Sequence, residues 1–340
     1  MNKVAIVVLN WNGIGFLRKF IPVLVSRTPQ DYADLYVADN GSADESVSWL
    51  RENVPGIRII SLGKNHGFAD GYNLALRQVE ATYFVLLNSD VEVTENWLPP
   101  LYTMMEENPD LAACMPKIKA YDDPSRFEHA GAAGGFIDKF GFPFCRGRIF
   151  NQTEEDEGQY DQVTNIFWAS GACLMIRSAI YEQAGGLDPY FFAHMEEIDL
   201  CWRIKNLGYR ICFNPASTIL HIGGGTLPKK NHKKTYYNFR NNLILLIKNL
   251  PRPKYRRTLL KRTLLDMVAA CYFLAKIDFG EFMAVLRAYL SVLGHLSKII
   301  RFRRQLKERI HPGYHPEIYE RSIVYSFFIK GIKTYRELKQ

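Results

Sequence analysis

Candidate strands and helices alternate along the first part of this chain. Short apolar runs with the length and composition of buried strands are separated by segments whose apolar residues recur at helical spacing. The strand candidates are residues 4–9, 35–38, 57–62 and 83–87, and the helix candidates are residues 14–26, 44–52 and 69–79. Such alternation predicts a mostly parallel sheet with helices on both of its faces.

Polar residues gather where each predicted strand ends. They are Asn10 and Asn12 after the first strand, Asp39 and Asn40 after the second, Lys64, Asn65 and Gly67 after the third, and Asn88 after the fourth. The carboxyl ends of parallel strands share one edge of a sheet, so these loops should converge. Asp39 suits a base N–H or a ribose hydroxyl, and Lys64 suits a phosphate. One such loop is more simply a turn, but four in succession favour a nucleotide site.

Asp90 follows the apolar run Tyr83–Leu87 almost directly. A carboxylate placed there suits Mg²⁺ or Mn²⁺, which prefer oxygen ligands and complete their shell with water and phosphate oxygens. The alternative is a plain turn that caps the next helix. The chain has neither a G-x-G-x-x-G after its first strand nor a P-loop motif, which disfavours a dinucleotide-binding Rossmann domain and a P-loop NTPase.

Further candidates lie in the second half of the chain. Residues 121–161 are expected to form an irregular insertion that walls the site, and residues 166–177 a strand interrupted by glycine. Glu196, Glu197 and Asp199 fall in the first turn of a predicted helix, where they either complement the helix dipole or include a general base. His221 ends a late strand, before glycines and Lys229-Lys230 that would form a flap over phosphates.

Together these motifs resemble the family-2 glycosyltransferases of the GT-A fold, especially the bacterial rhamnosyltransferase-like branch. The matching segments are collinear over about residues 3–240: Val8–Asn12, Val37–Ser42, Asn65–Asn73, Leu86–Val91, Gly171–Arg177, Gly185–Asp188 and Glu196–Arg203. The resemblance implies that Asp39 binds the nucleoside, that Asp90 and His221 bind the metal, and that Glu197 is the catalytic base.

This sequence departs from the family pattern at two positions. Asn88 replaces the first acid of the metal motif, and Glu197 stands where the family has aspartate, so Glu196 remains an alternative base. The residues predicted to bind substrate are Asn10, Asn12, Asp39, Asn40, Lys64, Asn65, Gly67, Asn73, Asn88, Trp168, Gly171 and Asp199.

The last part of the chain is strongly basic. Residues 251–340 hold 19 Lys or Arg against 7 Asp or Glu, whereas the preceding residues hold 24 against 28, within a total net charge of +8. Basic amphipathic helices there predict contact with an anionic membrane surface; packing on the catalytic domain and a homodimer contact are the alternatives. Nucleic-acid binding is disfavoured because the aromatic residues lie on the apolar helix faces.

The sequence therefore predicts a GT-A domain over residues 1–245 and a basic helical extension over residues 246–340. Within the GT-A domain, residues 1–120 would bind the donor and residues 121–245 the acceptor. The predicted enzyme is a metal-dependent inverting transferase that moves a sugar from a dTDP-rhamnose-like or UDP-sugar donor to a glycan or lipid-linked acceptor. A sugar-phosphate nucleotidyltransferase and an inactive assembly subunit are the alternatives. Scattered cysteines and the absence of a spanning segment predict a bacterial cytoplasmic protein, peripheral on the inner face of the membrane.

Overall fold

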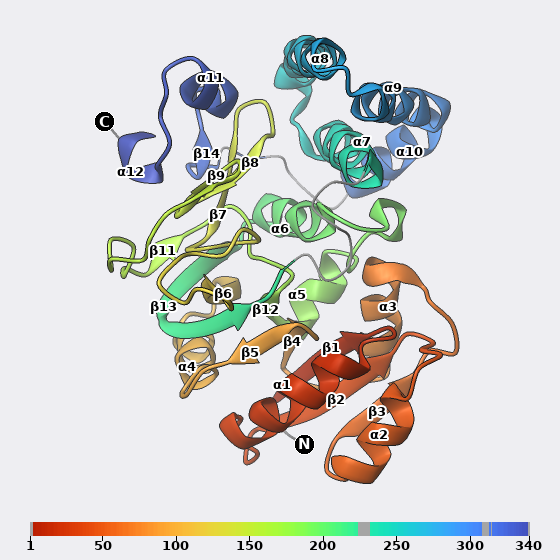
Figure 1. Ribbon diagram of the computed structural model, residues 1–340, viewed down its shortest axis with the longest axis vertical. Helices are drawn as coiled ribbons and strands as arrows, with labels where there is room; N and C mark the ends of the chain where they lie inside the picture. Colours follow the sequence, from red (N-terminus) through yellow and green to blue (C-terminus); the bar gives the residue numbers. More distant parts are fainter. Residues whose placement is uncertain (1–2, 224–231, 308–312, 314, 339–340) are drawn as a thin grey trace.

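A nine-stranded mixed sheet forms the centre of the chain (Figure 1). The computed structural model describes residues 3–223, 232–307, 313 and 315–338. Eight strands follow the order β11-β13-β6-β12-β4-β1-β2-β3, and β5 pairs with β13. Their bounds are β1 Val4–Asn10, β2 Ala33–Asp39, β3 Arg58–Ser61, β4 Tyr83–Asn88, β5 Val91–Val93, β6 Leu111–Ala120, β11 Thr164–Asn165, β12 Cys173–Arg177 and β13 Arg210–His221.

The register of the parallel strands aligns their carboxyl ends. Asn10 of β1 pairs with Asp39 of β2, and Asp39 pairs with Ser61 of β3. On the other side of β1, Leu9 pairs with Asn88 of β4. The predicted strand ends therefore meet at one edge. Strand β4 lies in the middle of the sheet, which explains why all of its apolar residues are buried.

Helices cover the sheet, and the last of those before the C-terminal group begins with Glu196, Glu197 and Asp199. The helices are α1 Ile14–Arg27, α2 Ser46–Asn53, α3 Gly67–Leu76, α4 Pro99–Glu107, α5 Ser178–Gln183 and α6 Glu196–Asn206, with a short 3-10 turn at Pro189–Phe191. Helix α6 is buried along most of its length, charged residues included, because it lies between the sheet and the C-terminal helices (Figure 1).

The insertion after β6 is more regular than its composition predicts. Strands β7 Gly135–Asp138, β8 Pro143–Cys145, β9 Arg148–Ile149 and β10 Gln152–Thr153 form a second sheet, which β14 Ile318–Tyr319 completes. The apolar runs at residues 209–213 and 218–222, which by themselves predict two strands, form one continuous strand β13 with an irregularity between Asn214 and Thr218. Pairing with distant strands, which local patterns do not reveal, accounts for both differences.

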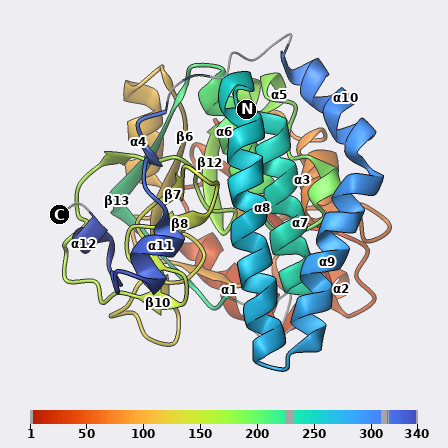
Figure 2. The same cartoon turned by 90° about the horizontal axis from the view of Figure 1, so that it is seen from above.

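Four helices follow the sheet: α7 His232–Asn249, α8 Arg252–Ala275, α9 Phe279–Gly294 and α10 Leu296–Lys307. Figure 2 shows α8 and α9 on the outside of this group, and short helices α11 Ile323–Phe328 and α12 Tyr335–Leu338 lie apart from it. The boundary expected after residue 245 falls inside α7, which is buried from Arg240 to Asn249. Helix α7 thus belongs to the packing of the catalytic domain.

No single helix within the described ranges has the length and apolar character needed to cross a membrane. Helices α9 and α10 pass that test only as a pair, and they are bent by 61° at the break between them.

Candidate active site

Asn40 ties the loop after β2 to the loop after β3. Its buried amide nitrogen donates to Asn65 Oδ1 at 3.2 Å and to the Gly67 carbonyl at 3.0 Å, while its oxygen accepts from the His66 amide at 2.9 Å. These contacts occupy the Asn40 side chain and fix the start of α3. They favour a structural role for Asn40 and a positioning role for Asn65 and Gly67.

Asn10 and Asp39 keep acceptor capacity at the sheet edge. Asp39 is buried, and among the described residues its carboxylate accepts only long hydrogen bonds, from the Ser42 amide at 3.3 and 3.4 Å. The Asn10 amide donates to Ser42 Oγ at 3.1 Å, and its buried oxygen lacks a hydrogen-bond partner among the described residues. Such atoms are costly unless a ligand satisfies them. The pair is suited to receive donor groups of a nucleoside.

The remaining loop residues border the same edge. Asn12 accepts from the Ala43 amide at 2.7 Å, which joins the first two loops. Lys64 is exposed, and its backbone packs so closely on Gly41 that a side chain at position 41 would collide with it. Asn88 is half-buried at the end of β4. Gly171 lies against the Phe68 ring.

The two predicted metal ligands lie in contact. Pairing of β5 with β13 sets His221 opposite Val91, and His221 Nε2 is 3.2 Å from Asp90 Oδ1. This contact is an ion pair in the absence of a metal, and its length is also close to the roughly 3 Å that separates two neighbouring ligands of an octahedral Mg²⁺ or Mn²⁺ ion. No cluster of three or more His, Cys, Asp or Glu side chains suited to a metal occurs in the described part of the chain; water and donor phosphates would supply the other ligands.

Glu128 completes this arrangement from the insertion. One carboxylate oxygen of Glu128 lies 3.2 Å from His221 Nδ1, the nitrogen opposite the one that faces Asp90. Burial alone would lower the pKa of His221, but Asp90 and Glu128 outweigh it and raise that pKa to about 10. No motif in the sequence singles out Glu128. The predicted flap over residues 224–231 lies outside the described residues.

Glu196 and Glu197 begin α6, as the sequence predicts. Each has a carboxylate oxygen without a hydrogen-bond partner among the described residues. Burial, and secondly the charge of Glu197, raise the pKa of Glu196 well above its ordinary value. Burial raises the pKa of Glu197 to about 7. Glu196 is buried and Glu197 only partly so, so Glu197 is the better placed to exchange a proton with a substrate at neutral pH.

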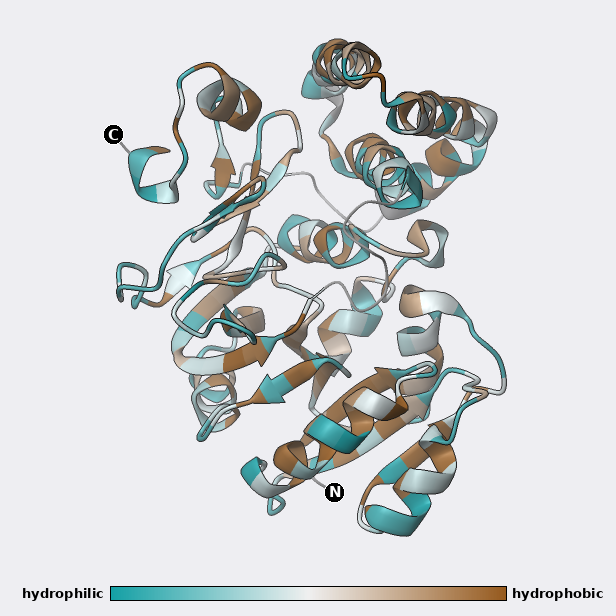
Figure 3. Cartoon of the chain, viewed as in Figure 1, coloured by the Kyte–Doolittle hydropathy of each residue, from teal (hydrophilic) through white to brown (hydrophobic). Residues whose placement is uncertain are grey.

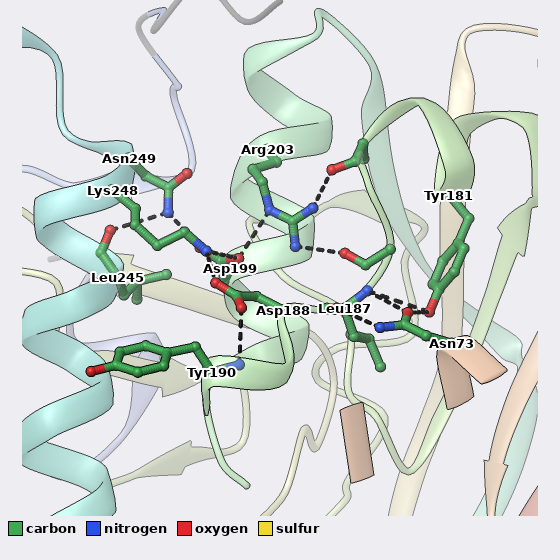
Figure 4. Close-up of polar contacts among 12 residues, drawn as sticks. Asn73, Tyr181, Leu187, Asp188, Tyr190, Asp199, Arg203, Leu245, Lys248 and Asn249 are labelled. Atoms are coloured by element: carbon green, nitrogen blue, oxygen red, sulfur yellow. Dashed lines mark hydrogen bonds and ion pairs between the residues drawn. The ribbon is translucent and has the colours of Figure 1, made fainter. Parts of the chain in front are cut away.

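Three other residues predicted to bind substrate make structural contacts. The Asn73 amide donates to the Leu187 carbonyl at 2.7 Å and accepts from Tyr181 Oη at 2.6 Å. Figure 4 shows this group beside a second one around Asp199, which pairs with Arg203 at 2.9 Å and Lys248 at 2.8 Å. Burial would raise the pKa of Asp199, but these two cations hold it below its ordinary value. Trp168 is buried, and its indole N–H donates to the Phe136 carbonyl at 2.9 Å. These contacts leave the predicted substrate roles without support.

The family model of glycosyl transferase family 2 matches residues 5–185, more than half of the chain. The chain belongs to glycosyl transferase family 2. Its relatives include the N-acetylglucosaminyl-diphospho-decaprenol L-rhamnosyltransferase of Mycobacterium tuberculosis, 24% identical over 65% of this chain and 78% of that protein. Rhamnosyltransferase WbbL of Escherichia coli is 21% identical over 58% of this chain and 81% of its own length. The predicted family and its rhamnosyltransferase-like branch are therefore confirmed.

Solved structures share the fold of this glycosyltransferase. GalNAc-T7, crystallised with UDP, GalNAc and Mn²⁺, superposes with a TM-score of 0.59 at 15% identity, over 76% of this chain and 51% of that one. The mannosyltransferase PcManGT from Pyrobaculum calidifontis, in complex with GDP-Man and Mn²⁺, gives 0.52 at 14% identity, over 93% and 81%. The GT-A class predicted from the sequence is confirmed.

Proposed function

We propose that this family-2 glycosyltransferase is a metal-dependent inverting enzyme that uses a nucleoside-diphosphate sugar, either dTDP-rhamnose-like or a UDP-sugar. The acceptor would be a hydroxyl of a cell-surface glycan or a lipid-linked saccharide. The observation that carries the proposal is Glu197, a partly buried carboxyl with a pKa of about 7 and an unsatisfied oxygen at the start of α6. The names of the relatives support the donor and acceptor classes.

Each part of the site would have a distinct task. Asp39 and Asn10 would hold the nucleoside, with Lys64 near the phosphates. Asp90 and His221 would hold a divalent cation, which supplies charge stabilisation for the departing diphosphate. Glu197 would take the proton of the acceptor hydroxyl as its oxygen forms a bond to the anomeric carbon and the bond to the diphosphate breaks. Attack from the face opposite the leaving group inverts the anomeric configuration.

Nucleotide release from a panel of dTDP-, UDP- and GDP-sugars tests this proposal. We expect one donor to be turned over with Mn²⁺ or Mg²⁺, and turnover to be lost with a chelator and in Asp90→Ala. Turnover that survives both treatments would refute metal dependence. Absence of both turnover and nucleotide binding would favour the inactive assembly subunit, and formation of a nucleotide sugar from a sugar phosphate would favour the nucleotidyltransferase.

We also propose that the outer helices attach the enzyme to an anionic membrane from the cytoplasmic side. Leu260, Leu264, Val268 and Tyr272 recur along one face of α8, and each is at least 59% exposed. Figure 3 shows such apolar stretches along α8 and α9. Exposed Lys254, Arg256, Arg257 and Lys261 begin the same helix. Apolar side chains flanked by cations suit the boundary between lipid tails and acidic headgroups.

Vesicle flotation tests this attachment. The protein should float with phosphatidylglycerol vesicles and not with phosphatidylcholine alone, and Leu264→Glu with Val268→Glu should abolish flotation. Val163→Glu, at an exposed apolar residue of the insertion, is the matched control. A concentration-dependent dimer that binds no vesicle would show instead that this face joins two copies of the chain.

A further inference from the structure

The turn directly before the catalytic carboxyls has an unusual backbone. Phe192, His194 and Met195 have φ angles of 63°, 68° and 75°. Side-chain-bearing residues rarely adopt this left-handed region, and they stay there only where the surrounding structure enforces it. Glu196 and Glu197 follow immediately, so the path of this turn sets where their carboxyl groups point.

Asn241 of α7 supplies the contacts that hold this turn. Its fully buried amide nitrogen lies within hydrogen-bond distance of three carbonyl oxygens, those of Phe191 at 2.9 Å and of Ala193 and His194 at 2.8 Å. Two amide hydrogens are thus shared among three acceptors. Arg240 donates to Asn241 Oδ1 at 2.8 Å, which orients the amide group so that its nitrogen faces the turn.

The same helix fixes both ends of the segment that contains the turn. Lys248, two helical turns after Asn241, pairs with Asp188 at 2.6 Å before the turn and with Asp199 at 2.8 Å after it. Asn249 adds a hydrogen bond to Asp199 at 2.8 Å (Figure 4). With its ends anchored at Lys248 and with Arg240 donating to the Tyr190 carbonyl at 3.0 Å, the segment is held in its middle by the hydrogen bonds of Asn241.

We infer that Asn241 is a positioning residue, which holds the strained turn so that Glu197 points at the acceptor hydroxyl. This inference rests on the proposed role of Glu197. Residue 241 lies outside the range matched by the family model, close to the end of the acceptor half that the sequence predicted over residues 121–245. Helix α7 is therefore a component of the catalytic apparatus.

Asn241→Ala tests the inference, with Asn238→Ala as the matched control on the same helix. Asn238 is partly exposed and has no side-chain hydrogen bond to any described residue. We expect kcat to fall about 10- to 100-fold in Asn241→Ala, because small displacements of a catalytic group cost up to about 100-fold. The KM of the donor should change less than about twofold, because none of the hydrogen bonds of Asn241 reaches the donor loops.

Amide hydrogen exchange over residues 191–197 gives a readout that is independent of turnover. Exchange there should accelerate in Asn241→Ala and remain unchanged in Asn238→Ala, whereas exchange in β1 and β4 should be unaffected by either. A glycine tolerates positive φ, so adding Met195→Gly to Asn241→Ala should recover part of the lost kcat. If Asn241→Ala does not fold, Asn241→Asp, which fills the same space without the donor, is expected to show the same losses.

Wild-type kcat in Asn241→Ala, or unchanged exchange in the turn, would overturn the inference. The proposed function has a separate control. If Glu197→Gln is inactive while Asn241→Ala is fully active, only the positioning role fails. If Glu197→Gln keeps wild-type turnover, the role of Glu197 as base fails first.

Discussion

Replacing Glu197 by glutamine should lower turnover by orders of magnitude and stabilise the fold. The substitution keeps the shape of the side chain and removes its ability to take a proton. Loss of a general base typically costs 10²- to 10⁴-fold in rate, and we expect kcat to fall within that range. Donor binding should persist, because Asp39 and Asp90 lie on other loops.

The gain in stability follows from the pKa of Glu197. Burial raises that pKa from 4.5 to about 7, and one pKa unit corresponds to about 1.4 kcal/mol, so ionising Glu197 costs the folded state about 3 to 4 kcal/mol. Between pH 4.5 and about pH 7, Glu197 keeps its proton in the folded chain and has lost it in the unfolded chain. The free energy of unfolding therefore falls as the pH rises through this window.

Thermal unfolding at pH 5 and pH 8 measures this effect. Glu197→Gln should resemble wild type at pH 5 and unfold at a higher temperature at pH 8. Wild-type kcat/KM should rise with pH through an ionisation near 7. Glu182→Gln, which changes an exposed carboxyl on α5, is the control for both measurements. A variant that is less stable than wild type at pH 8, or that keeps wild-type turnover, would refute the reasoning.

Three further predictions concern neighbouring side chains. Glu196→Gln should lower kcat less than about tenfold, because burial raises the pKa of Glu196 well above its ordinary value and so opposes the ionised form that a base needs; a loss as large as that of Glu197→Gln would make Glu196 the base. Glu128→Gln should weaken Mn²⁺ binding about 10- to 100-fold in a direct titration, because the contact of Glu128 orients His221; unchanged affinity would contradict this role. Asn73→Ala should lower the free energy of unfolding by about 2 kcal/mol, since buried partners lose their hydrogen bonds, and a higher donor KM in the folded variant would instead support a substrate contact.

Much of the fold could be predicted because its signals are local in the sequence. Apolar runs such as Tyr83–Leu87 predicted strands close to those observed, and polar residues marked their ends. The second sheet could not be predicted, since its two- to four-residue strands are stabilised by partners as distant as Ile318. The start of α7 was missed as well, because its first turns are polar and carry little apolar periodicity.

The sequence by itself determined the family, the sheet edge that carries the site, and the acids at Asp90 and at Glu196-Glu197, because motifs of adjacent residues specify these features. Only the tertiary structure decided which polar residues face one another. It assigned Asn73, Trp168 and Asp199 to buried contacts, and it brought Glu128 and Asn241 to the site from segments far along the chain. A buried polar group must find a partner wherever the fold provides one, and the identity of that partner is not written in the local pattern.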